Sequence, residues 1–265
     1  MEKKMYRGYL FDLDGTVYKG GQVIPEAVDF IGECLANNIP YQYVTNNSAL
    51  TPYELAQRLC GMGIEAVPED FFTSSMAAAG WIQEREGKNE HNNFEAVTVL
   101  AIGENGLHTA LNQAGVNLVD KAPADYVVIG IDRQFTYEKM KQAALAIRGG
   151  AVFISTNSDR AVPSEEGLLP GNGALTASIA TATGTDPIFV GKPETAIIQL
   201  ALDRLKLTAS DVLLIGDNLE TDIAAGHKSG VDTLLVFGGF SSREDVEKSA
   251  IKPTYTAETL KGWQR

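Results

Sequence analysis

Short apolar runs alternate with helical patterns along almost all of the 265 residues, and this alternation restricts the chain to one class of fold. Apolar runs of this kind are typical of strands buried in a parallel sheet. The predicted strands are Tyr9–Leu13, Tyr41–Val44, Val97–Ile102, Tyr126–Ile131, Val152–Ser155, Ile188–Val190, Val212–Ile215 and Leu234–Phe237. The predicted helices are Pro25–Ala36, Pro52–Leu59, Gly106–Gln113, Tyr137–Ile147, Leu175–Ala182 and Thr195–Leu205. The sequence therefore predicts an α/β protein with a doubly wound, mainly parallel sheet.

Two aspartates follow the first predicted strand. Asp12 and Asp14, in the segment Phe11–Val17, are separated by one residue, so in an extended chain both side chains point to the same face. Like charges this close raise one another's pKa unless a cation lies between them. The pair therefore indicates a site that needs a cation.

Three more polar motifs stand at the ends of predicted strands. They are Thr45–Asn47, Gly191–Pro193 and Gly216–Asn218. Ligands of open α/β sheets bind at the carboxyl ends of the strands. A long stretch without such motifs separates Thr45 from Lys192. We therefore expect a discontinuous core domain, residues 1–81 and 184–265, with an α/β cap domain inserted as residues 82–183.

The acidic residues predict phosphoryl-transfer chemistry. We expect Asp12 to attack phosphorus and to form an aspartyl-phosphate. Asp14 would protonate the leaving oxygen and then activate water. Asp12, Asp217 and the backbone carbonyl of Asp14 would supply oxygen ligands suited to magnesium.

The remaining motif residues predict phosphate binding. Gly15 allows a sharp turn, and its N–H would join the phosphate cradle. The hydroxyl of Thr45 and the backbone N–H of Asn46 would bind the equatorial oxygens. Lys192 would neutralise the nucleophile and the developing charge.

These motifs closely resemble those of the haloacid dehalogenase-like hydrolase superfamily. Residues 12–16 match its first motif, DxDGT, and Thr45 matches the second. Lys192 matches the third motif, and residues 216–222 match the fourth, GDxxxTD. The resemblance implies phosphatase activity and dependence on Mg²⁺. It also implies that Asp222, with Asn218 nearby, acts from the second shell by orienting Lys192 or a metal-bound water.

Two segments are similar to those of one group within the superfamily, the NagD-like or p-nitrophenylphosphatase-like phosphatases. They are Val44–Ser48 and Gly191–Pro193. This group carries a large α/β cap between the second and third motifs, as the spacing here requires. Capped relatives often dimerise, so the resemblance also implies a possible homodimer.

Four polar residues lie near strand ends of the expected cap. Asp132, Arg133, Asn157 and Arg160 are candidates for contacts to the leaving group of a substrate. The segment Gly167–Gly173 is interpreted as a glycine-rich turn.

The composition limits the kinds of binding partner and the cellular compartment that we expect. The formal net charge of -12 argues against a nucleic acid or an anionic membrane as the main partner. No apolar run approaches the roughly 20 residues that span a bilayer, and the N-terminus lacks the apolar region of a signal peptide. Cys34 and Cys60 have no metal-ligand spacing and fit reduced thiols. We expect a cytoplasmic enzyme that acts on a small phosphate ester, such as a sugar phosphate or a nucleoside monophosphate.

Two alternatives stay open. A signalling receiver also combines acidic residues, Thr and Lys around an accepted phosphoryl group. It is about half this length, however, and an acid at the position of Asp14 does not suit a long-lived phosphoaspartate. A phosphomutase shares the chemistry but normally carries its cap elsewhere.

Overall fold

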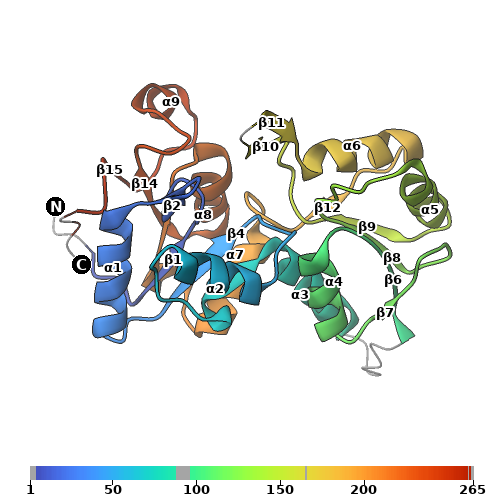
Figure 1. Ribbon diagram of the computed structural model, residues 1–265, viewed down its shortest axis with the longest axis horizontal. Helices are drawn as coiled ribbons and strands as arrows, with labels where there is room; N and C mark the ends of the chain where they lie inside the picture. The colour runs from blue at the N-terminus through green and yellow to red at the C-terminus, as the bar shows by residue number, and fades with distance from the viewer. Residues whose placement is uncertain (1–3, 88–95, 165, 262, 264–265) are drawn as a thin grey trace. The chain divides into compact units, whose positions relative to one another are not determined.

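The computed structural model describes residues 4–87, 96–164, 166–261 and 263, and it divides into two compact units (Figure 1). The first unit contains Met1–Thr45, Pro52–Phe72 and Lys192–Arg265. The second contains Asn46–Thr51 and Thr73–Gly191, so the chain passes between the units four times. The expected cap boundaries, residues 82 and 183, both lie inside the second unit.

A six-stranded sheet in the order β15-β14-β13-β1-β4-β5 forms the centre of the first unit. The chain starts at β1, adds β4 and β5 on one side and later adds β13, β14 and β15 on the other, which is a doubly wound arrangement. The strands are β1 (Gly8–Phe11), β4 (Tyr41–Thr45), β5 (Phe71–Thr73), β13 (Val212–Gly216), β14 (Asp232–Val236) and β15 (Tyr255–Ala257). The helices are α1 (Pro25–Ala36), α2 (Pro52–Gly61), α7 (Thr195–Leu205), α8 (Ala224–Ser229) and α9 (Arg243–Lys248). A small hairpin pairs β2 (Tyr18–Lys19) with β3 (Gln22–Val23).

The central strands β1 and β13 are buried along their whole length, which explains why both are apolar without alternation. Burial of each large apolar side chain stabilises the fold by about 1.5–3 kcal/mol. The two strands are parallel and in register, with Phe11 opposite Ile215. This register brings the residues that follow the two strands to the same edge of the sheet.

A five-stranded sheet in the order β12-β9-β8-β6-β7 forms the centre of the second unit. Its described pairs are parallel. Helices α3 and α4 cover one face, and α5 and α6 cover the other (Figure 1). The strands are β6 (Thr98–Ile102), β7 (Asn117–Leu118), β8 (Tyr126–Ile129), β9 (Val152–Ser155) and β12 (Ile188–Phe189), with the antiparallel hairpin β10 (Ala161–Ser164) and β11 (Gly167–Pro170). The helices are α3 (Ser74–Glu86), α4 (Asn105–Gln113), α5 (Tyr137–Arg148) and α6 (Asn172–Thr183).

Three local predictions need correction. The strand before Lys192 pairs with β9 in the second sheet, so Lys192 does not follow a strand of the first sheet. The strand Leu234–Phe237, which we expected to be the last of the first sheet, corresponds to β14, and β15 follows it at the edge. The segment Gly167–Gly173 forms β11 and the start of α6 rather than only a turn. In the first two cases the deciding contacts are tertiary, and a short run of residues does not encode them, whereas β11 pairs with β10 in a local hairpin.

Several elements had no prediction, among them β5 and α3. Helix α3 begins with small residues and is buried on much of its circumference, so it lacks the alternation of polar and apolar faces that marks a surface helix. Strand β5 has only three residues. Among the described residues, every helix is too short or too polar to cross a bilayer.

Candidate active site

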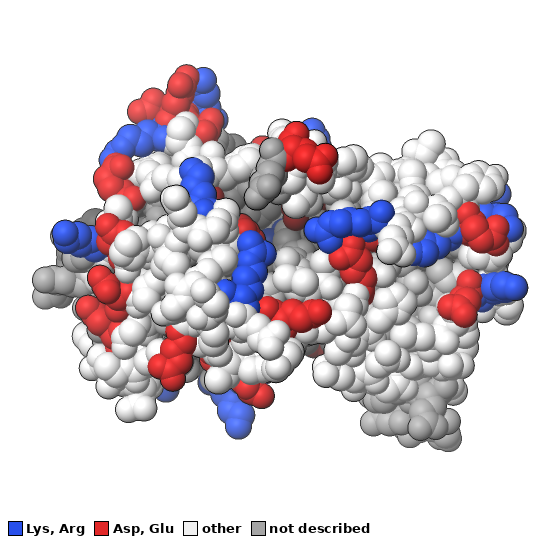
Figure 2. Space-filling view, in the orientation of Figure 1, with Lys and Arg blue, Asp and Glu red and all other residues white. Residues whose placement is uncertain are grey.

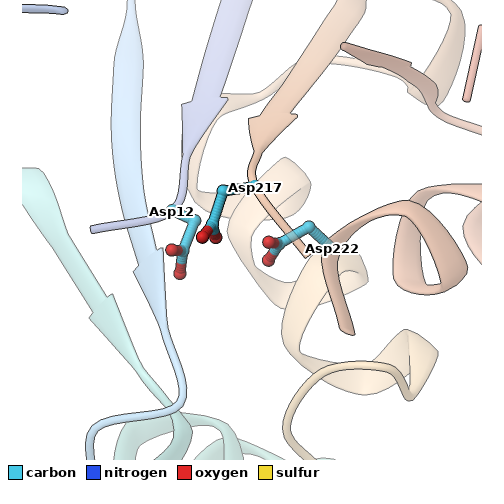
Figure 3. Close-up of side chains that lie close together, drawn as sticks. All are labelled: Asp12, Asp217 and Asp222. Atoms are coloured by element: carbon cyan, nitrogen blue, oxygen red, sulfur yellow. The ribbon is translucent and has the colours of Figure 1, made fainter. Parts of the chain in front are cut away.

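Three carboxylates meet at the carboxyl edge of the first sheet. Asp12 follows β1, Asp217 follows β13, and Asp222 comes from the π-helical turn Leu219–Ile223 (Figure 3). The N–H of Asp12 donates to the Ile215 carbonyl at 2.9 Å, which extends the β1–β13 pairing to the site. One carboxylate oxygen from each aspartate lies within 4.8 Å of the others.

A buried ammonium group lies against this cluster. Lys192 Nζ donates to Asp12 Oδ1 at 2.5 Å and to Asp222 Oδ1 at 2.7 Å. Burial by itself lowers the pKa of the Lys192 amine, but Asp12 and Asp222 outweigh it and raise the pKa above the ordinary value. Lys192 is therefore a permanent cation, held beside the carboxylate expected to attack phosphorus.

Burial raises the pKa of two carboxylates of the cluster, Asp12 and Asp217. Burial raises the pKa of Asp12 well above its ordinary value, against the opposing effect of Lys192. Burial, and next the charge of Asp222, raises the pKa of Asp217 to about 7. One Lys does not neutralise three carboxylates, so the cluster favours a further cation. Its donors are all oxygens, which fits magnesium.

The loop after β14 completes the surroundings of Asp217. The backbone N–H of Phe240 donates to Asp217 Oδ2 at 2.6 Å. The backbones of Gly15 and Gly239 pack so closely on the Asp217 carboxylate that a Cβ at either position would clash with it. Gly15 also has φ +89°, a left-handed conformation that favours glycine. The glycine of the first motif is thus required by steric contact with the fourth motif.

Asp14 lies beside this cluster and has different neighbours. The Tyr18 hydroxyl donates to Asp14 Oδ2 at 3.2 Å. Desolvation raises the pKa of Asp14, against the lowering effects of Arg58 and of the Tyr18 hydrogen bond. A carboxyl with a raised pKa is suited to give and take a proton. The N–H of Gly15 donates to the Tyr18 carbonyl at 2.7 Å, so it is used inside this turn rather than free for phosphate.

The residues of the second motif belong to different units. Thr45 ends β4, is buried, and belongs to the first unit. Asn46 begins the second unit, where its carbonyl accepts from Ser74 Oγ and from Asn157 Nδ2, each at 2.8 Å. Its side chain donates to the carboxylate of Asp159 at 3.3 Å. Phosphate binding by the Asn46 N–H stays a prediction.

Asn218 supports the turn that carries Asp222. Its side-chain oxygen accepts from the Glu220 N–H at 2.8 Å and so caps the turn. Its own N–H donates to Asp222 Oδ2 at 3.1 Å. One Asp222 oxygen thus faces Lys192 and the other faces the backbone.

The candidate substrate residues of the second unit are engaged with protein groups. Asp132 accepts from Lys139 Nζ at 2.6 Å, and Arg133 forms an ion pair with Glu104 at 2.7 Å. The Asn157 side chain donates a hydrogen bond to the Asn46 carbonyl. The Arg160 side chain is exposed, and its carbonyl accepts from the Gly171 N–H at 2.9 Å. Contact of these four residues with a leaving group stays a prediction.

Tyr18 and Arg58 were not singled out from the sequence. They meet only in the tertiary structure, with the Arg58 guanidinium carbon 4.9 Å from the centroid of the Tyr18 ring. The signal that could have found Tyr18 is its place directly after the first motif, at the point where the chain turns back toward Asp14.

Known proteins resemble this chain along nearly its full length. The family model "Haloacid dehalogenase-like hydrolase" matches residues 9–117, and a second, HAD-hydrolase-like, matches residues 189–263. An acid sugar phosphatase of Staphylococcus epidermidis is 46% identical over 257 residues, which cover 97% of this chain and 96% of that protein. The 5'-nucleotidase YutF of Bacillus subtilis is 44% identical over 260 residues and covers 98% of both chains.

A solved structure shares the whole fold. A mutant of the thermostable p-nitrophenylphosphatase from Bacillus stearothermophilus superposes with a TM-score of 0.88 at 43% identity and covers 99% of both chains. The doubly wound fold expected from the sequence is confirmed. With its motifs in the family's order and its relatives matched from end to end, the chain belongs to the haloacid dehalogenase-like hydrolases, in the NagD-like, p-nitrophenylphosphatase-like group of phosphatases.

Proposed function

We propose that this protein is a magnesium-dependent phosphomonoester hydrolase that acts on small phosphorylated metabolites through an aspartyl-phosphate intermediate. The observation that carries the proposal is the buried cluster of Asp12, Asp217 and Asp222 around Lys192 at the carboxyl edge of the sheet. A structural ion pair would be neutral. This cluster carries an excess of negative charge, which is costly unless a cation and a substrate use it.

In the first step, an oxygen of Asp12 would attack phosphorus while the bond to the leaving oxygen breaks. Lys192 keeps Asp12 ionised and stabilises the negative charge that develops. Asp14 would give its proton to the leaving oxygen, which departs as an alcohol. Thr45 would hold a phosphoryl oxygen with its hydroxyl.

In the second step, Asp14 would take a proton from water, and the water oxygen would attack the phosphorus of the aspartyl-phosphate. The bond between phosphorus and the Asp12 oxygen breaks, which restores the carboxylate and releases inorganic phosphate. One residue thus acts first as acid and then as base, and its raised pKa suits both roles.

Magnesium would be held by Asp12, Asp217 and the backbone carbonyl of Asp14, and when bound it would screen the charge between nucleophile and phosphate. Asp222 would act on Lys192, which it contacts directly. Gly15 has a steric role in this scheme, since its N–H is used within the turn.

The relatives suggest the substrate class. One is named for sugar phosphates and one for nucleotides, so we propose a sugar phosphate or a nucleoside monophosphate as substrate. We propose that the first unit is the catalytic core and that the second unit is the cap that selects the leaving group. Location in the cytoplasm and assembly as a homodimer belong to the same proposal.

The test is turnover of p-nitrophenyl phosphate and of a panel of phosphorylated metabolites with Mg²⁺, with Ca²⁺ and with EDTA. We expect repeated turnover with Mg²⁺, inhibition by Ca²⁺ and loss of activity in EDTA. With substrate in excess, acid quenching followed by mass spectrometry should detect phosphate on the Asp12 peptide. A protein that binds one phosphoryl group without turnover would instead be a receiver, and full activity in EDTA would contradict the metal requirement.

A further inference from the structure

Tyr18 holds Asp14 at two points. Its hydroxyl donates to Asp14 Oδ2 at 3.2 Å. The backbones of the two residues form an isolated bridge, and the Gly15 N–H donates to the Tyr18 carbonyl at 2.7 Å. The side chain and the main chain of Asp14 are therefore fixed against the same residue.

Tyr18 is itself fixed from two directions. Its side chain is buried, and the Arg58 guanidinium carbon on α2 lies 4.9 Å from its ring centroid. On the same hairpin, Lys19 Nζ donates to the Gly238 carbonyl at 2.8 Å, on the loop that also contacts Asp217. A change in the Tyr18 ring position would break its contacts with Arg58 and with Asp14.

We propose that Tyr18 is a positioning residue that orients Asp14 for proton transfer to the leaving oxygen, and that Arg58 holds Tyr18 in place. The inference rests on the proposed function, since Asp14 must have a proton to deliver. A carboxyl oxygen that accepts a hydrogen bond is the poorer site for the acid proton. With Oδ2 engaged by Tyr18, Oδ1 is the oxygen from which Asp14 would deliver the proton. It moves from there to the leaving oxygen, which keeps the electron pair of the broken bond to phosphorus.

The leaving group separates this role from a general structural one. An alkyl leaving group depends on protonation, whereas p-nitrophenolate departs almost without it. Tyr18→Phe keeps the ring and removes only the hydroxyl. At fixed pH and Mg²⁺ we expect kcat for a sugar phosphate to fall about tenfold and kcat for p-nitrophenyl phosphate to change less than about twofold, with KM little changed.

Arg58→Met provides a second route to the same result. Arg58 is exposed, so its replacement tests the inference even if the buried Tyr18 substitution lowers stability. We expect a smaller loss with the same preference for alkyl leaving groups. Two matched controls remove a similar group elsewhere. Tyr53→Phe on α2 removes a hydroxyl that accepts a hydrogen bond from Gln57 at 2.9 Å. Arg85→Met removes a guanidinium whose carbon lies 5.3 Å from the Trp81 ring centroid. Neither control should change the ratio of the two rates.

A double-mutant cycle with Asp14→Asn tests whether Tyr18 acts through Asp14. In the Asp14→Asn background, Tyr18→Phe should cause no further loss with the sugar phosphate. An equal loss with both esters, no loss with either, or a further tenfold loss in the Asp14→Asn background would each overturn the inference. A native protein that hydrolyses neither ester, or an Asp14→Asn variant without leaving-group preference, would refute the proposed function itself, and this inference with it.

Discussion

Both units carry charged side chains near the carboxyl ends of parallel strands, but they balance the charges differently. In the second unit Asp132 pairs with Lys139, and Arg133 pairs with Glu104. Each charge has one opposite partner, and three of the four side chains reach solvent to a substantial degree. On the face in Figure 2, acidic and basic side chains are likewise interspersed.

In the first unit, one buried lysine faces the three clustered carboxylates, so their charges are not balanced. Lys192 is 2% exposed and forms ion pairs with both Asp12 and Asp222, while the Asp217 carboxylate accepts a hydrogen bond from the backbone N–H of Phe240. Buried charge that is not neutralised is costly, whereas paired surface charge is nearly neutral in energy. An excess of buried carboxylates, rather than polar residues at strand ends, therefore distinguishes the proposed active site from the strand ends of the second unit.

The largest effect should follow removal of the nucleophile. Asp12→Asn should lower kcat for p-nitrophenyl phosphate at least about 10⁴-fold, because the covalent route is lost. The variant should stay folded, since one of several crowded negative charges is removed. Steady-state kinetics and thermal unfolding measure both. Asp29→Asn, on the exposed side of α1, is the matched control and should leave both values unchanged. Activity above a few per cent would refute the assignment.

Removal of the central cation should damage stability as well as activity. Lys192→Met leaves Asp12 and Asp222 buried without their partner, which should cost about 3–5 kcal/mol in the free energy of unfolding. Activity should fall about 10²–10³-fold. Urea unfolding should show part of the stability restored in the double variant Lys192→Met, Asp222→Asn. An unchanged free energy of unfolding in the single variant would contradict the proposal that Lys192 offsets the buried negative charge of the cluster.

Magnesium should stabilise the protein more at pH 8 than at pH 6. Asp217 has a pKa of about 7 when folded and an ordinary value of 3.8, so between these values the folded state holds a proton that the unfolded state lacks. Without metal, the contribution of Asp217 to the free energy of unfolding is therefore present at low pH and is lost as pH rises through about 7. A cation replaces that proton, and saturation at about 100 times its Kd should add about 2.7 kcal/mol. Thermal unfolding with Mg²⁺ or EDTA measures the difference, and Asp217→Asn should abolish its pH dependence. An equal gain at both pH values would contradict the site.

The smallest effect should come from the balanced pairs of the second unit. Arg133→Gln should change the free energy of unfolding by less than about 1 kcal/mol, because the Arg133 side chain is largely exposed. If Arg133 contacts the leaving group, KM for one metabolite should rise while KM for p-nitrophenyl phosphate stays the same. A panel of substrates measured with Arg133→Gln and Arg160→Gln would show which of them, if either, discriminates.

The fold class and the placement of candidate site residues at strand ends could be predicted from sequence because they lie in local patterns. Apolar runs followed by Asp12, Thr45 and Asp217 encode both a strand and its reactive end. The sheet that holds the strand before Lys192 could not be predicted, since Ile188 pairs with Ile154 only after the second unit has folded. The Tyr18–Arg58 contact has the same origin, because no sequence spacing links β2 to α2.

The chain passes four times between the units, which limits how parts of this enzyme can be exchanged with those of a relative. A chimaera that exchanges only residues 73–191 would keep the host's residues 46–51. The Asn46 carbonyl would then have to find donors equivalent to Ser74 and Asn157 in a foreign sequence, and the Ser48 carbonyl one equivalent to Ser75. A graft meant to transfer substrate preference should therefore include the short segment with the long one, although that segment begins directly after Thr45.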